Sequence, residues 1–443
     1  MVRVRYAPSP TGLLHIGNAR TALFNYLFAK KHKGVFVLRI EDTDVLRNVS
    51  GGEESQIKYL NWLGIEFDES PNNPGEYGPY RQLERLNIYQ DYAKKLVELG
   101  SAYEEASQNG GIGIRFKVPK EKKYHWHDLV RGDIQVSSKD IEDWIILKDN
   151  GIPTYNFAVV IDDYLMKITH VLRGEEHITN TPKQLMIYEA FNITPPQFGH
   201  MNLIINKNGK KLSKRDADVH QFIHQYKELG YLGEAVSNFL CLLGYYPQDS
   251  VEVFKLREIK KSFNEHNLLK SPSLFDTEKL KYINKMHLRQ LNEHDLVEFL
   301  TPFLLATTIK ANNQDWLKNF ILTFKERIAF GEQTKDIYQK FFREDFNIQD
   351  EAVNFLKNNN LLPVIREFLV QLPKVATSYD FENAINNVKN GYQGPQKNVF
   401  IGLRIATTGE TSGPALPVQL TLLGLKVVES RLLQTIKRME CIE

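Results

Sequence analysis

Apolar and polar positions at the start of the chain predict a strand, a turn and a helix. Residues 2–6 alternate branched or aromatic side chains with arginines, as a strand does, and residues 8–12 hold two prolines and a glycine that end it in a rigid turn. Apolar residues at positions 23–28 then recur at helical spacing. We expect this helix to begin near Gly17 or Asn18, with its N-terminal amides free for an anion.

A second strand follows the helix. Residues 35–40 form a dense run of branched and aromatic side chains, which is typical of a buried parallel strand. Glu41, Asp42 and Asp44 follow the carboxyl end of this strand. Because ligands of open α/β sheets bind beyond the carboxyl ends of the strands, we expect these acids at the rim of the crevice that holds His15.

The pattern then changes to that of an inserted α+β module. We predict a helix at 89–99, a loop at 108–113 and a strand at 114–118. The core pattern resumes at 154–165, and Thr181 followed by Pro182 marks a helix start.

The last part of the chain reads as helical. Three apolar stripes at helical spacing predict core positions there. They are Leu317, Phe320, Ile321, Phe324 and Ile328; Leu361, Ile365, Phe368, Leu369 and Leu372; and Val428, Leu432, Ile436 and Met439. Residues 255–289 hold nine Lys or Arg against four Asp or Glu, which fits either an RNA-facing surface or a solvated helical face.

Composition fits a multi-domain globular protein. The chain has 443 residues, of which 42% are hydrophobic and 25% are charged, so two to four domains are expected. A net charge of +2 is too small to announce a nucleic-acid binder. Two distant cysteines, Cys241 and Cys441, indicate neither a disulfide framework nor a zinc site. With no leader pattern and no membrane-spanning run, we expect a cytoplasmic protein without membrane contact.

Two segments carry candidate chemistry. Residues 5–18 place His15 and Gly17 at the turn before a helix, where an imidazole and close backbone approach suit a phosphate. Residues 211–215, Lys-Leu-Ser-Lys-Arg, follow a polar stretch with Gly209 and supply mobile positive charge. Alone, the first segment fits an ordinary surface turn equally well, and the second fits a solvated basic loop. As a pair they indicate chemistry on ATP.

The pair resembles the two signatures of class I aminoacyl-tRNA synthetases, which end in His-Ile-Gly-His and read Lys-Met-Ser-Lys-Ser. Here the sequences are His-Ile-Gly-Asn at 15–18 and Lys-Leu-Ser-Lys-Arg at 211–215. Further segments at 7–12, 18–25, 38–44 and 153–158 resemble bacterial glutamyl-tRNA synthetases. The resemblance is specific to about residue 290 and returns at 398–424.

The resemblance implies an α/β fold. It consists of a class I synthetase Rossmann-like nucleotide-binding domain with an inserted α+β acceptor-binding module, followed by an all-α anticodon-binding region. The expected parts are the first half of the catalytic domain (1–88), the shortened module (89–150), the second half (151–215), a helical stem-contact junction (216–290) and the anticodon-binding region (291–443).

The resemblance also implies which residues form the site. The catalytic set is His15, Lys211 and Lys214. The ATP-binding set is Pro8, Ser9, Thr11, Gly12, His15, Gly17, Asn18, Lys211, Leu212, Ser213, Lys214 and Arg215. The glutamate-binding set is Arg5, Ala7, Ser9, Glu41, Tyr155 and Arg173. Glu41 would hold the ammonium group, and the two arginines would engage carboxylate. Read without the family, Arg5 and Arg173 would be surface or ion-pair arginines, for instance with Glu175 or Asp42.

The implied reaction is the ATP-dependent ligation of L-glutamate to tRNA-Glu through glutamyl-adenylate. ATP would enter with Mg²⁺, and no resident metal is expected in the site. The family also implies a monomer. A glutamyl-queuosine synthetase, a small nucleotidyltransferase and a non-catalytic tRNA-binding paralogue are the alternatives. The helical C-terminal region argues against the glutamyl-queuosine synthetase, and the glutamate pocket argues against the nucleotidyltransferase. The retained catalytic residues argue against the non-catalytic paralogue.

The inserted module departs from the family pattern. Many relatives carry a cysteine-rich zinc site after a tyrosine that matches Tyr103, whereas Glu104, Glu105 and Ala106 follow it here. His125 and His127 are spaced like metal ligands, but no cysteine lies nearby. We therefore predict surface histidines and no structural zinc.

Overall fold

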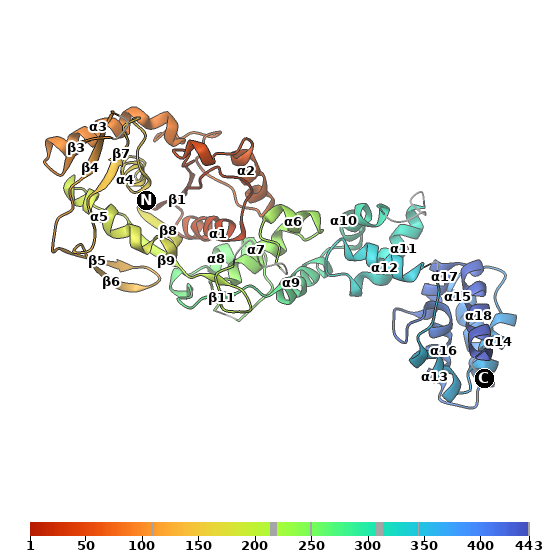
Figure 1. Ribbon diagram of the computed structural model, residues 1–443. Coiled ribbons are helices and arrows are strands. Elements are labelled where there is room, and N and C mark those ends of the chain that lie inside the picture. Colours follow the sequence, from red (N-terminus) through yellow and green to blue (C-terminus); the bar gives the residue numbers. More distant parts are fainter. Residues whose placement is uncertain (108–109, 213–218, 249, 307–312, 344, 442–443) are drawn as a thin grey trace. The chain divides into compact units, whose positions relative to one another are not determined.

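The chain forms two compact units in a computed structural model that describes residues 1–107, 110–212, 219–248, 250–306, 313–343 and 345–441 (Figure 1). Unit 1 comprises Met1–His287 and unit 2 comprises Leu288–Glu443. Ser213, Lys214 and Arg215, which were predicted to bind ATP, lie outside the described residues. None of the helices in the described ranges has the length and apolar character needed to cross a membrane.

Parallel strands form the centre of unit 1. Strand β1 (Arg3–Tyr6) pairs in parallel with β2 (Val35–Leu38), and β8 (His170–Gly174) pairs in parallel with β9 (Gln197–Met201). Helix α1 (Ile16–Lys31) connects β1 to β2 and contacts both β1 and β8. The expected strand–turn–helix at the start of the chain and the strand that follows it are therefore confirmed.

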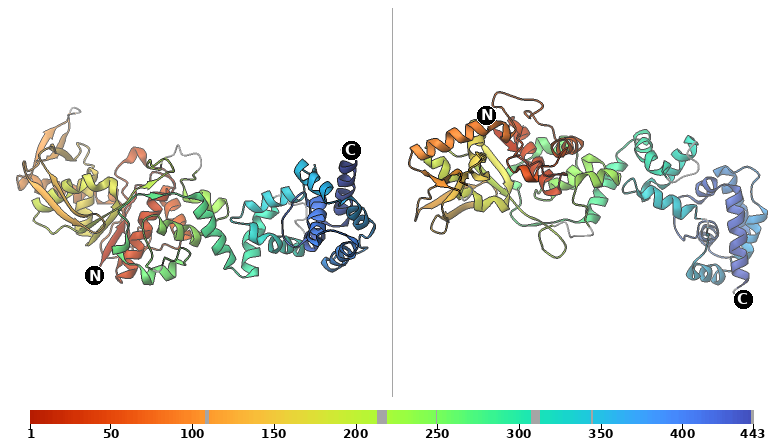
Figure 2. Two further views of the ribbon diagram at one scale, coloured as in Figure 1. Left: turned by 90° about the horizontal axis from the view of Figure 1, so that it is seen from below. Right: turned by 45° about the horizontal axis from the view of Figure 1, so that its top comes forward.

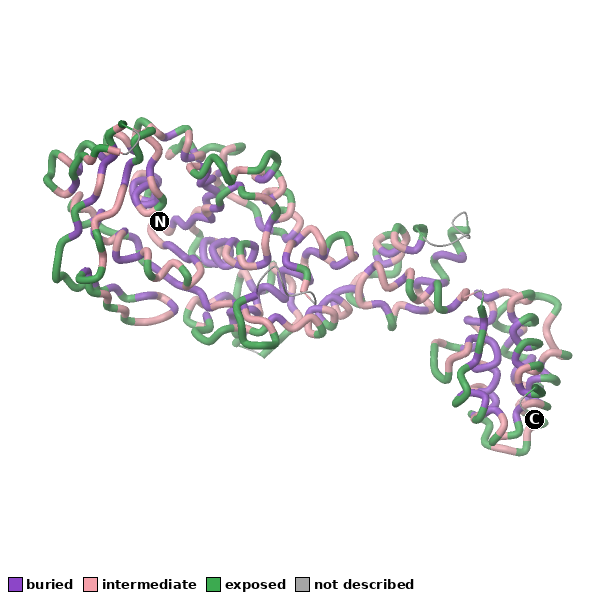
Figure 3. Tube along the Cα trace, in the orientation of Figure 1, coloured by how far each residue is buried: buried purple, intermediate pink, exposed green. Residues whose placement is uncertain are grey.

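The two strand pairs meet at β1 and β8. The amide of Thr169, just before β8, donates to the Arg3 carbonyl at 2.9 Å, and the Arg3 amide donates to the Thr169 hydroxyl at 2.9 Å. Alignment in this direction brings the carboxyl ends of β1, β2 and β8 to one edge. In α/β folds that edge is where a ligand site forms. Most residues of these strands and of α1 are buried (Figure 3).

The region between β2 and β8 contains a small antiparallel sheet and a hairpin (Figure 2). Its elements are α3 (Leu86–Glu98), β3 (Ala102–Ala106), β4 (Ile112–Phe116), β5 (Lys123–Asp128), β6 (Gly132–Ser137) and β7 (Trp144–Leu147). The sheet order is β3-β4-β7, and β5 pairs with β6. Strand β5 alternates, with Tyr124, Trp126 and Asp128 buried and the residues between them exposed. This face packs on β9, where the Leu129 amide donates to the Phe198 carbonyl at 2.9 Å.

Helices complete unit 1 around this frame. They and the remaining short strands are α2 (Gly52–Trp62), α4 (Tyr155–Leu165), α5 (Thr181–Ala190), β10 (Ile204–Ile205), α6 (Ile223–Glu228), α7 (Gly233–Leu242), α8 (Leu256–Ser262), β11 (Ser273–Leu274) and α9 (Thr277–Arg289). Four 3₁₀ turns lie between them: η1 (Val45–Arg47), η2 (Gln82–Arg85), η3 (Glu175–Asn180) and η4 (Glu265–Asn267). The expected helix start at Thr181 is confirmed, with Pro182 in its first turn.

The regular secondary structure of unit 2 is all helical in its described residues. Its elements are α10 (Glu293–Leu305), α11 (Gln314–Phe324), η5 (Lys325–Arg327), α12 (Gln333–Phe341), α13 (Asp350–Asn358), α14 (Leu362–Val370), α15 (Ser378–Gly391), α16 (Gln396–Thr408), α17 (Leu416–Leu423) and α18 (Leu425–Glu440). The predicted stripes are buried, except that Leu369, Leu372 and Ile436 are only half-buried. Trp316 ties α11 to α17, because its indole Nε1 donates to the Leu422 carbonyl at 3.1 Å.

Two predicted boundaries shift. The helix expected at 89–99 begins at Leu86, because the 3₁₀ turn η2 runs directly into α3. The strand expected at 114–118 is β4 at Ile112–Phe116, where Ile114 and Phe116 face the core and pair with β3 and β7. Local patterns identify these elements, but their ends depend on their neighbours.

Candidate active site

A cleft of about 520 Å³ lies in unit 1 where the carboxyl ends of β1, β2 and β8 meet the N-terminus of α1. It gathers most of the predicted site. The predicted residues that line it are Arg5, Ala7, Pro8, Ser9, Thr11, His15, Gly17, Asn18, Glu41, Tyr155, Arg173, Lys211 and Leu212. Gly12, in the same turn, is not among the lining residues; its φ of +127° fits the bend that only glycine adopts easily.

Residues that sequence reasoning missed complete the lining. They are Tyr6, Arg20, Thr21, Arg47, Leu172, Gly174, Glu176, His177, Asn202, Leu203, Ile204 and Gln221. Arg20 gave a usable signal, because an arginine within the apolar pattern of α1 needs partners when it is buried. Its guanidinium donates to Asn202 Oδ1 at 2.9 Å and to the Leu243 carbonyl. No pattern in the sequence marks Gln221 as a site residue.

The end of the cleft where glutamate was predicted to bind, the amino-acid end, is built on a buried network of ion pairs. Arg5 Nε donates to Asp163 Oδ1 at 3.0 Å, and Arg39 Nη1 donates to the same oxygen at 2.7 Å. Arg39 Nη2 in turn donates to Glu41 Oε1 at 3.0 Å. Arg39 is fully buried and the other three side chains are at least nine-tenths buried. The network therefore fixes Arg5 and Glu41, which face the cleft, through Asp163 and Arg39 behind them.

Asp162 is a second buried carboxylate and lies next to this network. Asp162 accepts from Arg85 Nε at 2.7 Å, from the Tyr89 hydroxyl at 2.8 Å and from Gln82 Nε2 at 2.9 Å. Its Oδ2 also lies 3.6 Å from Arg39 Nε. The consecutive acids Asp162 and Asp163 interrupt an otherwise apolar helix, α4, which is the sequence signal that would have revealed a buried charge network.

Protonation in the network follows from burial and its partners. Burial raises the pKa of Glu41, although Arg39 and Arg5 act in the opposite direction. Burial also acts to raise the pKa of Asp163, but Arg5 and Arg39 outweigh it, so the pKa of that carboxyl is lowered. Asp163 is therefore the anion that holds the two arginines together.

The prediction that three acids line the rim was wrong for two of them. Asp42 turns away from the cleft, where its Oδ1 accepts the Leu83 amide at 2.8 Å. Asp44 is exposed and lies 3.7 Å from Arg47 as an ion pair. Successive side chains beyond a strand point in different directions, so only Glu41 enters the cleft.

Arg173 occupies the opposite wall and makes no ion pair with Glu175. Its Nε donates to His200 Nε2 at 3.1 Å and its Nη2 donates to Thr181 Oγ1 at 2.9 Å. Nη1 is buried and has no partner among the described residues. Glu175 instead pairs with Arg131. The ion-pair reading of Arg173 was thus wrong, and for Arg5 the partner is Asp163 rather than Asp42.

Tyr155 lies at the N-terminus of α4, on the edge of the same cleft. Its hydroxyl is 3.3 Å from His177 Nδ1. Burial and the neighbouring Arg173 lower the pKa of His177 to about 4, so this imidazole is neutral near pH 7. Because His177 is neutral, Arg173 carries the positive charge on this wall of the cleft.

The end of the cleft where ATP was predicted to bind, the nucleotide end, is formed by the turn after β1 and the start of α1. His15 is the N-cap residue, and its Nδ1 accepts the Gly17 amide at 3.1 Å. Its Nε2 therefore carries the hydrogen and faces Gln221 Oε1 at 3.1 Å. The Ile16 amide donates to the Gln221 carbonyl. The expectation that the first amides of the helix are free was thus wrong for two of them. Gln221 accepts the Ile16 amide, and His15 accepts the Gly17 amide.

Lys211 approaches this end from the segment that follows β10, where it forms an isolated antiparallel bridge with Ile205. Its Nζ is 3.4 Å from Glu176 Oε1, and both side chains are about half exposed. Among the described lining residues, Arg5, Arg20, Arg47, Arg173 and Lys211 stand against Glu41 and Glu176. Positive charge therefore exceeds negative charge in the cleft, which favours anionic ligands.

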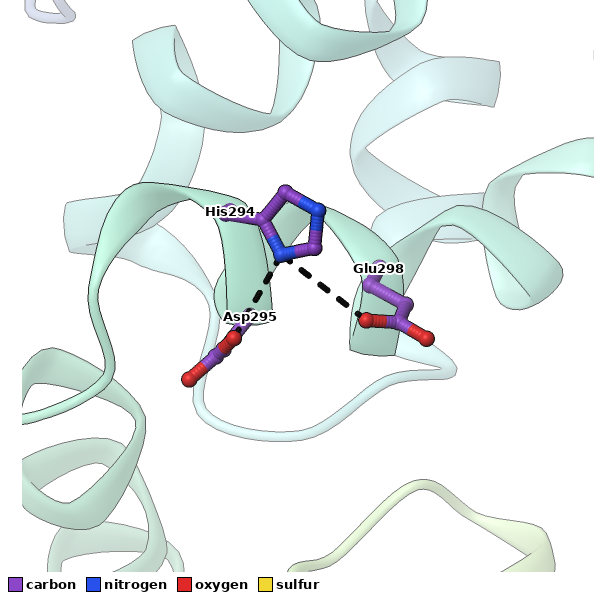
Figure 4. A group of neighbouring side chains, drawn as sticks. All are labelled: His294, Asp295 and Glu298. Carbon is purple, nitrogen blue, oxygen red and sulfur yellow. Dashed lines mark hydrogen bonds and ion pairs between the residues drawn. The ribbon is translucent and has the colours of Figure 1, made fainter.

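Two exposed clusters of histidine with carboxylates lie outside the cleft. His127 Nδ1 is 2.9 Å and His125 Nε2 is 3.7 Å from Asp133 Oδ1, on the exposed face of the β5–β6 hairpin. In α10, His294 Nδ1 lies 3.4 Å from Asp295 Oδ1 and 3.9 Å from Glu298 Oε2 (Figure 4). All these side chains are exposed, and such charge pairs on surfaces are common without a metal. The absence of a structural zinc stays a prediction.

Comparison with known proteins matches both units. The family described as tRNA synthetases class I (E and Q), catalytic domain, matches residues 1–112 and 104–282. An anticodon binding domain family matches residues 295–436. The chain is 49% identical to the glutamate–tRNA ligase of Acholeplasma laidlawii over 438 residues, with 98% of each chain covered. It is 46% identical to that of Geobacillus thermodenitrificans, covering 97% of this chain and 98% of the other.

Solved structures agree with these sequence matches. The crystal structure of a glutamate–tRNA ligase from Elizabethkingia meningosepticum, in complex with its amino acid, superposes with a TM-score of 0.87. Its sequence is 30% identical, with 99% of each chain covered. The glutamate–tRNA synthetase of Elizabethkingia anophelis gives a TM-score of 0.89 at 30% identity, covering 98% and 99%. The chain therefore belongs to the class I aminoacyl-tRNA synthetases of the glutamyl and glutaminyl group, within the bacterial glutamate–tRNA ligases.

Proposed function

We propose that the cleft of unit 1 activates L-glutamate with ATP and transfers it to tRNA-Glu through a glutamyl-adenylate, releasing pyrophosphate and AMP. The observation that carries this proposal is the buried Arg173, which lines a cleft with excess positive charge and whose Nη1 makes no hydrogen bond among the described residues. A buried donor without an acceptor is costly, and a substrate carboxylate would satisfy it.

The amino-acid end suits glutamate by charge. Arg5 and Arg173 would bind carboxylate from two walls, Tyr155 would donate a hydroxyl hydrogen bond, and Glu41 would accept the ammonium group. Glutamine would place an amide where the arginine donors expect an anion, and this leaves polar groups unpaired. Aspartate is shorter by one methylene, a difference worth roughly 1 to 3 kcal/mol in such a pocket. Charge is therefore the stronger discriminator.

The nucleotide end suits the triphosphate of ATP. Ser9, Thr11, Gly17 and Asn18 lie along the turn and the first residues of α1, where the positive end of the helix dipole favours phosphate. His15 would donate from Nε2 after exchanging its contact with Gln221. Lys211 and, from the sequence, Lys214 would follow the charge that spreads onto pyrophosphate. Mg²⁺ would enter as part of the ATP substrate complex.

The reaction needs alignment more than proton transfer. The substrate α-carboxylate is ionised near neutral pH and needs no general base. Its oxygen attacks the α-phosphorus in line, the bond to the bridging oxygen breaks, and pyrophosphate leaves. A terminal ribose hydroxyl of the tRNA then attacks the adenylate carbonyl carbon, and AMP leaves. The helical unit 2 is the part that we assign to anticodon binding, on the basis of the family match at 295–436.

The test is charging of purified tRNA by the intact protein. With ATP, Mg²⁺ and labelled glutamate, we expect glutamyl-tRNA from tRNA-Glu, and a parallel reaction with tRNA-Gln defines the tRNA range. Lys214→Ala should lose rate and keep its affinity for tRNA. If the intact protein binds verified tRNA but charges neither substrate, it is a binding paralogue and the proposal is wrong.

We also propose that the protein is a monomer, as the family resemblance implies. Light scattering after size-exclusion chromatography checks the monomer. A dimer mass that persists on dilution would contradict it.

A further inference from the structure

Three buried polar side chains connect the β5–β6 hairpin to the amino-acid end of the cleft. Asp128 ends β5, His200 lies in β9 and Arg173 lies opposite His200 in β8. Their exposed fractions are 1%, 0% and 5%. His200 Nδ1 lies 2.5 Å from Asp128 Oδ2, and Arg173 Nε donates to His200 Nε2 at 3.1 Å.

The hydrogen bonds fix the tautomer of His200. Arg173 Nε always carries a hydrogen, so His200 Nε2 must accept. The ring hydrogen therefore sits on Nδ1 and is donated to Asp128. Burial lowers the pKa of His200, which agrees with a neutral ring. Its tautomer depends on Asp128 being an acceptor at Oδ2.

Asp128 is itself held in one orientation. Its Oδ1 accepts the amides of Val130, Arg131 and His200, each at 3.0 Å. Burial acts to raise the pKa of Asp128, but the hydrogen bonds from the side chain and backbone of His200 outweigh it and lower the pKa. With Oδ1 engaged by three amides, Oδ2 is the atom that faces the imidazole.

Arg173 is fixed at the other end of this connection. Its Nε is held by His200 and its Nη2 by Thr181, which together define the plane of the guanidinium. Nη1 is buried and makes no hydrogen bond among the described residues, and both Arg173 and the neighbouring Tyr155, which interacts with this guanidinium, line the cleft. A planar fork held at two nitrogens presents the third in a single direction.

We propose that Asp128 and His200 are positioning residues for glutamate, which hold the Arg173 guanidinium so that Nη1 meets a substrate carboxylate. This inference rests on the proposed function, because it takes Arg173 as a glutamate ligand. It gives the hairpin of residues 123–137 a role in amino-acid affinity, although no residue of that hairpin lines the cleft.

Asp128→Asn tests the tautomer. The three amides should keep the side-chain oxygen of the new asparagine, so its NH₂ group takes the place of Oδ2 and donates to His200 Nδ1. The ring hydrogen then moves to Nε2, where it opposes the Arg173 Nε–H. We expect the KM for glutamate to rise about 10-fold, from the cost of one unpaired buried donor. The KM values for ATP and tRNA should stay within about 2-fold, since neither ligand depends on this contact.

His200→Asn is the second variant, in case Asp128→Asn folds poorly. The shorter asparagine side chain can still donate to Asp128 from the place of Nδ1, but nothing occupies the place of Nε2. It should raise the KM for glutamate as Asp128→Asn does. The matched control is Asp133→Asn on the exposed face of the same hairpin, whose partners are His125 and His127. It should have the wild-type KM for glutamate.

Charging kinetics and glutamate calorimetry on the full chain, with thermal unfolding of each variant, separate the outcomes. A wild-type protein that does not charge tRNA refutes the proposed function. A wild-type protein that charges, with folded Asp128→Asn and His200→Asn variants that keep the wild-type glutamate KM and Kd, refutes this inference alone. Equal increases in the KM for ATP and for glutamate would also overturn it, because they indicate general distortion of the cleft.

Discussion

The two ends of the cleft differ in how the protein holds the side chains that line them. At the amino-acid end, Arg5, Glu41 and Arg173 are at least nine-tenths buried, and buried partners hold each of them. At the nucleotide end, Asn18 and Lys211 are exposed. A pocket that must distinguish one amino acid from others needs charges that are fixed before the ligand arrives. A site that follows a departing pyrophosphate needs side chains that can move.

The comparison explains where discrimination resides. Preorganised donors at the amino-acid end are expensive to leave unpaired, so an ill-matched substrate is penalised there. Exposed cations at the nucleotide end are screened by water and contribute less to stability. Changes at the first end should therefore alter both stability and glutamate binding, whereas changes at the second should alter rate.

The largest effect should come from Asp163→Asn, which removes the anion shared by Arg5 and Arg39. Breaking a buried ion pair leaves uncompensated charge, so we expect the free energy of unfolding to fall by about 3 kcal/mol. Urea denaturation followed by circular dichroism measures this. The matched control is Glu84→Gln, which removes an exposed partner of Arg81 and should cost less than about 1 kcal/mol. An equal decrease in the free energy of unfolding of the two variants would show that the buried network contributes no more to stability than the exposed ion pair.

Arg173→Lys should have the next largest effect. Lysine keeps the charge but loses the planar fork that His200 and Thr181 hold, so the ligand-facing donor is no longer oriented. We expect a rise of roughly 30-fold in the KM for glutamate, from the loss of a charged hydrogen bond. Charging kinetics at varied glutamate and at varied ATP measure it. A comparable rise in the KM for ATP would contradict the division between the two ends.

At the nucleotide end, Lys211→Ala should lower kcat by roughly 10-fold through the loss of one cation beside the reacting phosphates. The unfolding midpoint should not change, because the half-exposed pair with Glu176 contributes little. Lys210→Ala changes an exposed neighbour that does not line the cleft and serves as the control. A lower unfolding midpoint in Lys211→Ala, with a normal kcat, would contradict the proposed difference between the two ends of the cleft.

The smallest effect concerns pH. Because the pKa of His177 is lowered to about 4, the KM for glutamate should stay constant from pH 8 to about 5.5. In the unfolded chain this histidine binds a proton near pH 6.5. Between these values the unfolded state binds more protons, so the free energy of unfolding should decrease as the pH falls from about 6.5 toward 4.

The variant His177→Asn should make this pH dependence of unfolding shallower, as urea denaturation at several pH values would show. An unchanged slope would mean that His177 is already charged in the folded protein.

Sequence reasoning was strongest where local rules decide the structure. The strand before the turn, the helix after it and the apolar stripes of unit 2 follow from spacing alone, because each depends on a single burial pattern. The same rules failed for Asp42 and Asp44, since the direction of a side chain beyond a strand depends on the loop that follows. They failed also for the amides of Ile16 and Gly17, which Gln221 and His15 cap.

The partners of the site residues were the part that sequence could not supply. Arg5 meets Asp163 across 158 positions of sequence, and His200 meets Asp128 across 72. No periodicity connects residues so far apart. The two acids in the apolar helix α4 gave a signal that a buried charge exists, but not which arginines would neutralise it.

The sequence by itself determined the family, the strand–turn–helix at the start of the chain and about half of the residues that line the cleft, because short motifs and hydrophobic spacing are local properties. Only the tertiary structure decided how those residues are held: Asp163 behind Arg5, Arg39 behind Glu41, and Asp128 with His200 behind Arg173. The physical reason is that buried charge must be neutralised by whatever packing brings near it, and packing is a property of the whole fold.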